Sequence, residues 1–150
     1  MKPNLPLVIT GGLIGTPAIT ALIYVIAPLI GVRMNAVEML AETFGGLRTG
    51  MLVHILNGAI IFPLAFVFLF YRLLPGSPVT RGVIFGVLLW LASQLIVMPM
   101  TGAGAFSVSA GGIKVVALLL FGHVLYGWLL GFLPVLAEEG QSPAKRPVNS

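Results

Sequence analysis

Long apolar stretches separated by short polar connections run through almost the whole chain. Four of them are long enough to cross a lipid bilayer: Leu7–Ile30, Gly50–Leu74, Val83–Met100 and Ile113–Leu136. A helix needs about 20 apolar residues to span the hydrocarbon core. Only a helix satisfies all its backbone polar groups within one open-ended segment, and no stretch alternates with the period of two of a barrel strand. The pattern predicts an all-α membrane protein with four transmembrane helices.

The connection between the first two helices has a pattern of its own. Within residues 34–44, Val37, Leu40 and Phe44 fall on one face of a helix, while Glu38 and Glu42 fall on another. A short helix with one apolar and one charged face lies at the membrane surface. We therefore expect a short interfacial helix between helices 1 and 2.

The remaining connections are richer in glycine, proline and serine. Pro75-Gly76-Ser77-Pro78 predicts a tight turn between helices 2 and 3. Residues 102–112 carry glycine, serine and alanine and no charge, and we expect a flexible loop there. From Ala137 the chain is polar and contains proline. We expect a four-helix transmembrane domain over residues 1–136 and a disordered tail over residues 137–150.

The two halves of the apolar pattern resemble each other. Helix 3 laid over helix 1 without a gap matches five pairs: Gly11 with Gly82, Gly15 with Gly86, Ala21 with Ala92, Pro28 with Pro99 and Gly31 with Gly102. Helix 4 laid over helix 2 matches His54 with His123 and Gly58 with Gly127. Weak internal symmetry of this kind is common in membrane folds. We expect a tandem repeat of two helical hairpins, over about residues 5–74 and 80–136.

Three sequence pieces resemble a family of small four-pass bacterial inner-membrane proteins. They are His54-x-x-Asn57-Gly58 followed by Phe62-Pro63, then Gly86 through Pro99, then Gly122-His123-x-x-Tyr126-Gly127. The resemblance covers most of residues 5–136. It implies the four-pass fold and a location in the bacterial inner membrane. No function is assigned to that family, so the resemblance implies nothing about activity.

Composition narrows the function classes. Of the 150 residues, 58% are hydrophobic and only 8% are charged, far too few charges to cover a soluble surface. The chain has no cysteine, which excludes disulfides and thiolate metal sites. Its net charge of +4 is spread thinly, without the basic cluster of a nucleic-acid-binding protein. The lipid bilayer is therefore an expected partner and nucleic acid is not.

The lysines and arginines indicate an orientation, because cytoplasmic loops carry an excess of them. One side of the predicted topology holds Lys2, Arg72, Arg81, Lys145 and Arg146, and the other holds Arg33, Arg48 and Lys114. This bias favours both termini in the cytoplasm.

Polar residues within the predicted helices need a reason, because they are costly in lipid. With the topology above, six of them fall in the outer half of the membrane: Tyr24, His54, Asn57, Gln94, His123 and Tyr126. One hypothesis is a polar network between the helices, with bonds such as His54 to Gln94 or His123 to Tyr24.

Two ligand hypotheses use the same histidines. In the first, His54 and His123 are the axial ligands of a b-type haem, Gly58 and Gly127 leave room for the flat ring, and Trp90 packs against it. In the second, His54 joins Met51, Met98 and Met100 in a copper(I) site, because copper(I) accepts thioethers. Two histidines alone do not complete a zinc shell.

No catalytic motif is recognisable in the sequence. The chain has no aspartate, and its serines have no histidine–aspartate partner. The favoured interpretation is a non-enzymatic accessory or scaffold subunit of a larger inner-membrane complex, for example a respiratory one, with other membrane subunits or a second copy of itself as partners. The alternatives are a bis-histidine haem electron-transfer protein, a small homodimeric transporter and a copper-handling protein.

Overall fold

The structure, a computed structural model, describes residues 3–32 and 36–140. Helices of the α, π and 3-10 types follow one another along the chain, and no strand occurs within these ranges. Four helical stretches are long and apolar enough to cross a membrane: Leu5–Leu29, Leu47–Phe70, Pro78–Met100 and Ile113–Ala137. The prediction of an all-α membrane protein with four transmembrane helices is confirmed.

The first three spanning helices each change between α-helical and π-helical geometry along their length. The first consists of α1 (Leu5–Ala21), the π-helical η1 (Leu22–Ile26) and α2 (Ala27–Leu29). The second consists of α4 (Leu47–Leu56), the π-helical η2 (Asn57–Ile61), α5 (Phe62–Ala65) and the π-helical η3 (Phe66–Phe70). The third consists of α6 (Pro78–Ala92), the π-helical η4 (Ser93–Val97) and α7 (Met98–Met100). The fourth is the single long helix α8 (Ile113–Gly140).

Two helix boundaries differ from those expected from hydropathy. The third helix begins at Pro78, inside the predicted turn, with Ser77 as its N-cap accepting a hydrogen bond from the Thr80 amide at 3.2 Å. Proline suits the first helical position because its missing N–H needs no partner there. The fourth helix continues to Gly140, past the expected end at Leu136, because alanine and glutamate are good helix formers even outside lipid. The predicted tail is therefore helical at its start, and residues 141–150 lie outside the described residues.

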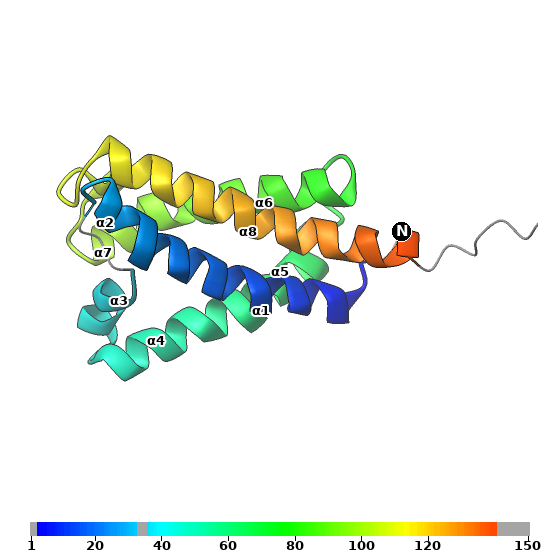
Figure 1. Cartoon of the computed structure of the whole chain (residues 1–150), viewed down its shortest axis with the longest axis horizontal. Helices are drawn as coiled ribbons and strands as arrows, with labels where there is room; N and C mark the ends of the chain where they lie inside the picture. The colour runs from blue at the N-terminus through cyan, green and yellow to red at the C-terminus, as the bar shows by residue number, and fades with distance from the viewer. Residues whose placement is uncertain (1–2, 33–35, 141–150) are drawn as a thin grey trace, which may run out of the picture.

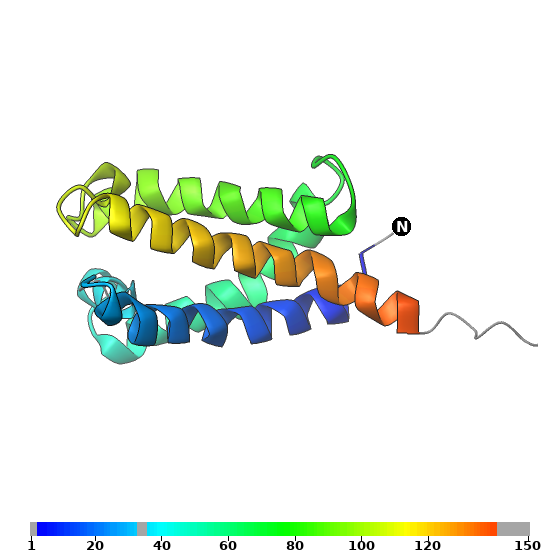
Figure 2. The same cartoon turned by 45° about the horizontal axis from the view of Figure 1, so that its top comes forward.

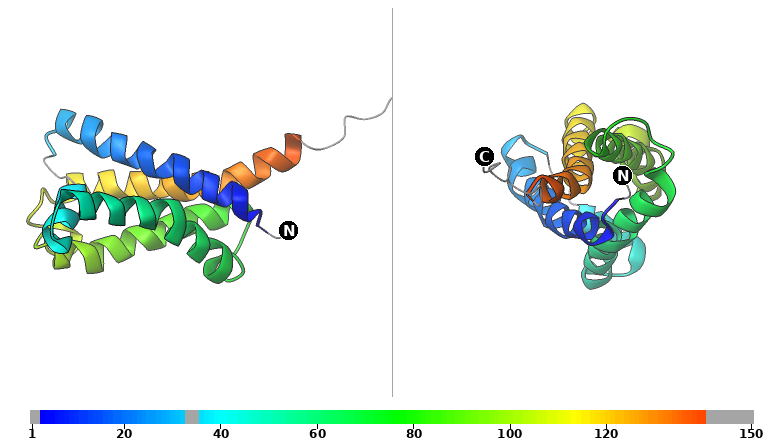
Figure 3. Two further views of the ribbon diagram at one scale, coloured as in Figure 1. Left: turned by 90° about the horizontal axis from the view of Figure 1, so that it is seen from below. Right: turned by 90° about the vertical axis from the view of Figure 1, so that its right-hand side faces the viewer.

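The helices form two hairpins that lie side by side (Figures 1 and 2). Helix α8 is the most buried of the four and packs against both α6 and α1. The start of α1 and the end of α8 lie at one end of the bundle, which we call the terminal end. The predicted interfacial helix is present as α3 (Ala36–Phe44) at the opposite end, which we call the α3 end. The views from below and along the bundle show the same arrangement (Figure 3).

Close packing of α6 against α8 depends on glycine. A Cβ atom on Gly82 would collide with the backbone of Gly127, and one on Gly86 would collide with the carbonyl group of His123. Glycine lets helix backbones approach closely where no hydrophobic driving force exists between helices. Gly11 does the same for α1, because a Cβ there would press against the backbone of Leu129.

Proline explains most of the π-helical turns. Pro28, Pro63 and Pro99 each stand two residues after the end of a π-helical stretch, at the second position of α2, α5 and α7. A proline inside a helix lacks a donor and collides with the carbonyl four residues earlier, so the preceding turn widens. The spanning helices therefore stay continuous across these prolines.

The ends of helices 1 and 3 share one local geometry. Gly31 and Gly102 both have positive φ, of 75° and 79°. The Val32 amide donates to the Ala27 carbonyl at 2.8 Å, and the Ala103 amide donates to the Met98 carbonyl at 3.0 Å. These pairs occupy the positions matched by the proposed alignment of helix 3 on helix 1. The tandem repeat stays a hypothesis, which this correspondence supports.

The connection between helices 3 and 4 is folded inward, where a flexible loop was expected. It contains the short 3-10 helix η5 (Ala105–Ser107), and Ser107 is completely buried. The Ser107 hydroxyl donates to Oε1 of Gln94, also completely buried, at 3.0 Å. To make this contact, Phe106 and Ser107 adopt positive φ angles of 52° and 53°. A buried amide needs a partner, and this loop supplies one.

Candidate functional site

A cavity of about 310 Å³ lies between the two hairpins. It separates two clusters of buried side chains, one around Phe66 and Phe85 toward the terminal end and one around Val115 and Leu118 toward the α3 end. The cavity is not sealed, because α4 packs mainly on α3 and η2 and has no extensive contact with α6 or α8. Most of its wall is apolar: Ile19, Ile23, Met39, Leu40, Phe62, Leu89, Ala92, Ile96, Val97, Met98 and Leu119.

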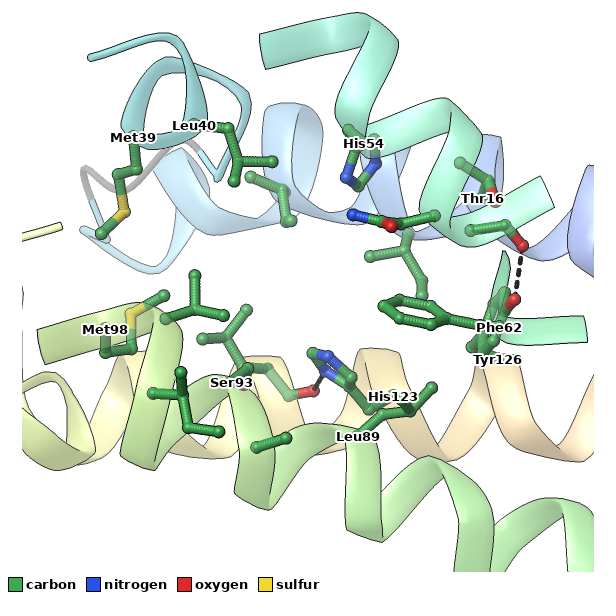
Figure 4. Close-up of a pocket in the computed structure, with 18 residues that line it drawn as sticks. Thr16, Met39, Leu40, His54, Phe62, Leu89, Ser93, Met98, His123 and Tyr126 are labelled. Carbon is green, nitrogen blue, oxygen red and sulfur yellow. Dashed lines mark hydrogen bonds between the residues drawn. The ribbon is translucent and has the colours of Figure 1, made fainter. Parts of the chain in front are cut away.

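Both predicted histidines line this cavity, one from each hairpin (Figure 4). His54 comes from α4 and His123 from α8. None of the described residues that line the cavity carries a fixed charge. The site is therefore an apolar chamber with a small number of neutral polar groups.

The His54 ring is held by the first helix. Its Nε2 atom lies 3.0 Å from the hydroxyl of Thr20. The Thr20 hydroxyl in turn donates to the carbonyl of Thr16 at 2.8 Å. This chain of bonds fixes the direction of the His54 ring by joining α4 to α1.

The His123 ring is held by its own helix. Its Nδ1 atom lies 2.7 Å from the carbonyl oxygen of Leu119, one turn earlier in α8. The rest of the ring reaches into the cavity (Figure 4). A backbone carbonyl bonded to one imidazole nitrogen leaves the other nitrogen directed toward a ligand, as is usual around metal-binding histidines.

Tyr126 closes the cavity toward the terminal end. Its hydroxyl donates to the carbonyl of Gly58 in the other hairpin. Its ring packs edge-on against Phe62, with centroids 6.5 Å apart, and lies close to Gly15. Asn57, one turn after His54, also lines the cavity. Tyr126 thus connects the two hairpins on the terminal-end side of the histidines.

Gln94 and Tyr24 lie outside the cavity, so the six polar residues do not form one network. Gln94 bonds to Ser107 and not to His54. The Tyr24 side chain is 45% exposed on the outside of the bundle and does not bond to His123. The two bonds suggested as examples from the sequence are therefore wrong, and each histidine has a different partner.

A haem fits these residues only in part. His123 presents a ring nitrogen to the cavity, whereas Nε2 of His54 is engaged by Thr20. The Cβ position of Gly58 is filled by Thr16, and that of Gly127 by the backbone of Gly82 and Gly86. These glycines therefore serve helix packing and leave no slot for a flat ring.

Trp90, the third predicted haem contact, also lies away from the cavity. Its Nε1 donates to the carbonyl of Val116 at 3.1 Å, and its ring packs against Phe106. Of the residues predicted around a haem, only His123 is therefore oriented as an axial ligand would require.

The predicted copper residues are dispersed. Met98 lines the cavity together with Met39, at the end away from Tyr126 (Figure 4). Met51 and Met100 do not line it, and Met100 is 66% exposed. Among the described residues, no group of three histidine or carboxylate side chains is placed to hold a metal ion.

Sequence reasoning missed Thr16, Thr20 and Phe62 as residues of the site. The two threonines stand four residues apart on one face of the first helix, a spacing visible in the sequence. Threonine in a membrane helix bonds readily to its own backbone, which makes it a weak signal. Only the hydrogen-bond contact between the two side chains in the structure shows that Thr20 also faces His54.

The sequence profile described as "Family of unknown function (DUF6789)" matches residues 4–143. A search of curated proteins and a search of solved structures found no match. The family match confirms the resemblance to a family without an assigned function.

Proposed function

The chain belongs to the DUF6789 family, which has no assigned function, and from its geometry we propose a non-enzymatic accessory role in a larger membrane assembly. Its specific contribution is to hold a small hydrophobic molecule in the cavity between the two hairpins. The observation that carries this proposal is the cavity itself, about 310 Å³ in volume and lined by two histidines from different hairpins.

The properties of the cavity match those of binding sites for small molecules. Such sites are concave, mostly apolar and at least about 300 Å³ in volume, with a few well-placed polar groups. Here the polar groups include His54, Asn57 and His123, and each histidine ring is held in place by a hydrogen bond on its far side. Rings fixed in this way lose little freedom when a ligand binds.

The described residues that line the cavity offer no activated nucleophile, which supports a binding role. Among the described residues that line it, none is a carboxylate, lysine or cysteine. Its one serine, Ser93, donates its hydroxyl proton to the carbonyl of Trp90 at 2.7 Å. A serine nucleophile instead needs its hydroxyl bonded to a base.

The test is native mass spectrometry of protein released from membranes in mild detergent. We expect a small-molecule adduct on the wild type. Leu89→Trp places an indole in the cavity wall and should remove the adduct. Leu88→Trp is the matched control, because Leu88 is adjacent, partly exposed and outside the cavity. An adduct that persists in Leu89→Trp, or its absence from the wild type, would contradict the binding role.

The proposal of an accessory role rests on the large part of each spanning helix that is not buried against other helices of this chain. In the first three spanning helices only a minor share of the residues is buried within the chain. Apolar faces left uncovered in this way are available to lipid and to other membrane helices. Native electrophoresis of solubilised membranes should place the protein in a complex heavier than one or two copies. A protein that migrates alone while its cellular role is intact would contradict this part of the proposal.

The bis-histidine haem hypothesis is favoured by one observation only, the direction of the His123 ring. A bound haem would differ from a colourless hydrophobic ligand in its visible absorption spectrum. A haem held by His54 and His123 gives a Soret band that His54→Ala and His123→Ala each abolish. We expect no such band in protein from haem-replete cells, and a band lost in both variants would replace our proposal.

A further inference from the structure

The protonation of the two imidazoles follows from their hydrogen-bond partners. The Leu119 carbonyl can only accept, so Nδ1 of His123 must carry the proton of that bond. No lining carboxylate is present among the described residues to pair with a charged imidazolium, so the ring is neutral. In a neutral imidazole the second nitrogen has no proton. Nε2 of His123 therefore faces the cavity as an acceptor.

His54 presents the same property through its other nitrogen. The Thr20 hydroxyl has one proton, and this proton is committed to the Thr16 carbonyl. Thr20 can then only accept from Nε2 of His54, so that nitrogen is the protonated one. Nδ1 of His54 is left as the acceptor of the ring. Each histidine therefore has one ring nitrogen that can only accept a hydrogen bond.

A ligand that hydrogen-bonds to either free ring nitrogen must bring the proton, because both nitrogens can only accept. Asn57 lies one turn from His54 on the cavity wall, and its side-chain amide can donate to the ligand oxygen. A charged head group would stay unpaired here, because no described lining residue carries the opposite charge. These conditions describe a neutral hydroxyl group.

The size and opening of the cavity limit the shape of the rest of the ligand. A volume of about 310 Å³ corresponds to roughly ten water molecules at their share of liquid volume. This accommodates one ring or a short chain but not a complete lipid. The cavity wall includes Leu89 and Leu119, which suit an apolar body. The cavity is only partly enclosed, so a longer tail can extend out of it.

We infer that the cavity binds a neutral hydroxylated amphiphile, with an alcohol or phenol group that donates to Nε2 of His123 and an apolar ring or chain against Leu89 and Leu119. This inference rests on the proposed binding function and specifies its ligand class. The hydroxyl is the distinguishing feature, because an ether or hydrocarbon of the same shape cannot donate to either ring.

Two probes of matched shape test the inference: 4-octylphenol and its methyl ether, which lacks the donor. Dissociation constants are measured by thermal shift of the full chain in lipid nanodiscs, for the wild type and for His123→Leu. The ratio of the two constants is compared between proteins, so that different partitioning of the probes into lipid cancels. We expect the preference for the phenol to be about fivefold greater in the wild type, the value of one net hydrogen bond.

Two further variants separate the possible failures. His123→Gln retains an acceptor oxygen and should keep the preference, which also covers the case in which His123→Leu does not fold. Leu89→Trp should abolish binding of both probes. Equal binding of phenol and ether to wild type and His123→Leu, still abolished by Leu89→Trp, would overturn the ligand class and leave the binding function standing. No binding of either probe would overturn the inference, while the adduct found by native mass spectrometry decides the proposed function separately.

Discussion

At the scale of single residues, Gly127 carries the contact between the two helices of the second hairpin. It meets Gly82 backbone to backbone, and nothing larger than hydrogen fits at either position. Gly122, one and a half turns earlier in α8, faces the side chains of Ile19 and Leu22, and a Cβ there would meet them at 3.5 Å. The two glycines therefore look alike in sequence but differ in what surrounds them.

Substitution by alanine should separate these two positions. Gly127→Ala forces α6 and α8 apart, and overpacking costs about 1–3 kcal/mol. The gain in helix propensity, about 1 kcal/mol, offsets only part of this cost. We expect a net loss of about 1 kcal/mol in the free energy of unfolding, measured by titration with SDS in mixed micelles. Gly122→Ala should be neutral or stabilising. A loss of the same size in both variants would show that close approach is not what Gly127 provides.

A second prediction concerns the buried pair of Ser107 and Gln94. Ser107→Ala removes the only side-chain donor that reaches Gln94 Oε1 among the described residues. An acceptor left buried without a partner costs about 1–3 kcal/mol. Thermal denaturation in detergent should show this loss. Ser109→Ala, in the same loop but exposed, is the control and should leave stability unchanged. A Ser107→Ala variant as stable as that control would mean that the loop is not held by this bond.

The burial of individual polar residues was only partly predictable from the sequence. The alignment of helix 3 on helix 1 matches Ile23 with Gln94 and Tyr24 with Leu95. The first pair is buried, and the second pair is exposed by 45% and 54%. The proposed alignment pairs Tyr24 with a leucine, which is compatible with the outward direction of Tyr24 in the structure. Hydropathy and depth alone do not give the direction of a side chain.

At the scale of elements, helix α3 covers one end of the cavity. Met39 and Leu40 contribute to the lining, and Val37 is buried. The helix lies directly on Gly50 of α4, where a Cβ would collide with the backbone of Ala41. The amphipathic pattern predicted α3 correctly, and the structure shows that its apolar face packs against the protein.

Displacing α3 should expose the cavity. Gly50→Leu places a side chain where the α3 backbone now lies. Because the chain has no cysteine, a single Leu40→Cys reports the change through its rate of maleimide labelling. We expect labelling to become several-fold faster in Gly50→Leu. Thr49→Leu, on an exposed position of the same turn, should have no effect. Equal rates in the two variants would show that α3 does not act as a cover.

The positions of the spanning helices along the chain were predictable, but the directions of their side chains were not. Apolar length located all four spans within a few residues, because lipid imposes a minimum length on any crossing. The prolines were visible, yet whether a proline breaks a helix or widens it into a π turn depends on the surrounding packing. Each π turn rotates the residues beyond it, so side-chain directions past Leu22, Asn57 and Ser93 could not be read from an ideal helical period.

At the scale of the whole molecule, the two hairpins meet closely toward the terminal end and part toward the α3 end. Phe66 and Phe85 pack with ring centroids 5.3 Å apart, and Tyr126 donates to Gly58 across the same junction. Beyond Tyr126, α4 separates from α6 and α8 and the cavity begins. The matched histidines predicted a site shared by the hairpins. Its volume and neutrality depend on how far the hairpins separate, which no sequence pattern reports.

The central claim is that this space between the hairpins is a binding site. Photoaffinity labelling with a diazirine derivative of 4-octylphenol, followed by peptide mapping, tests it most directly. We predict labels on cavity-facing residues of both hairpins, such as Ile19 and the buried Leu119, that are lost in Leu89→Trp and retained in Leu88→Trp. Labels confined to lipid-facing residues such as Leu95, or unchanged in Leu89→Trp, would contradict the account.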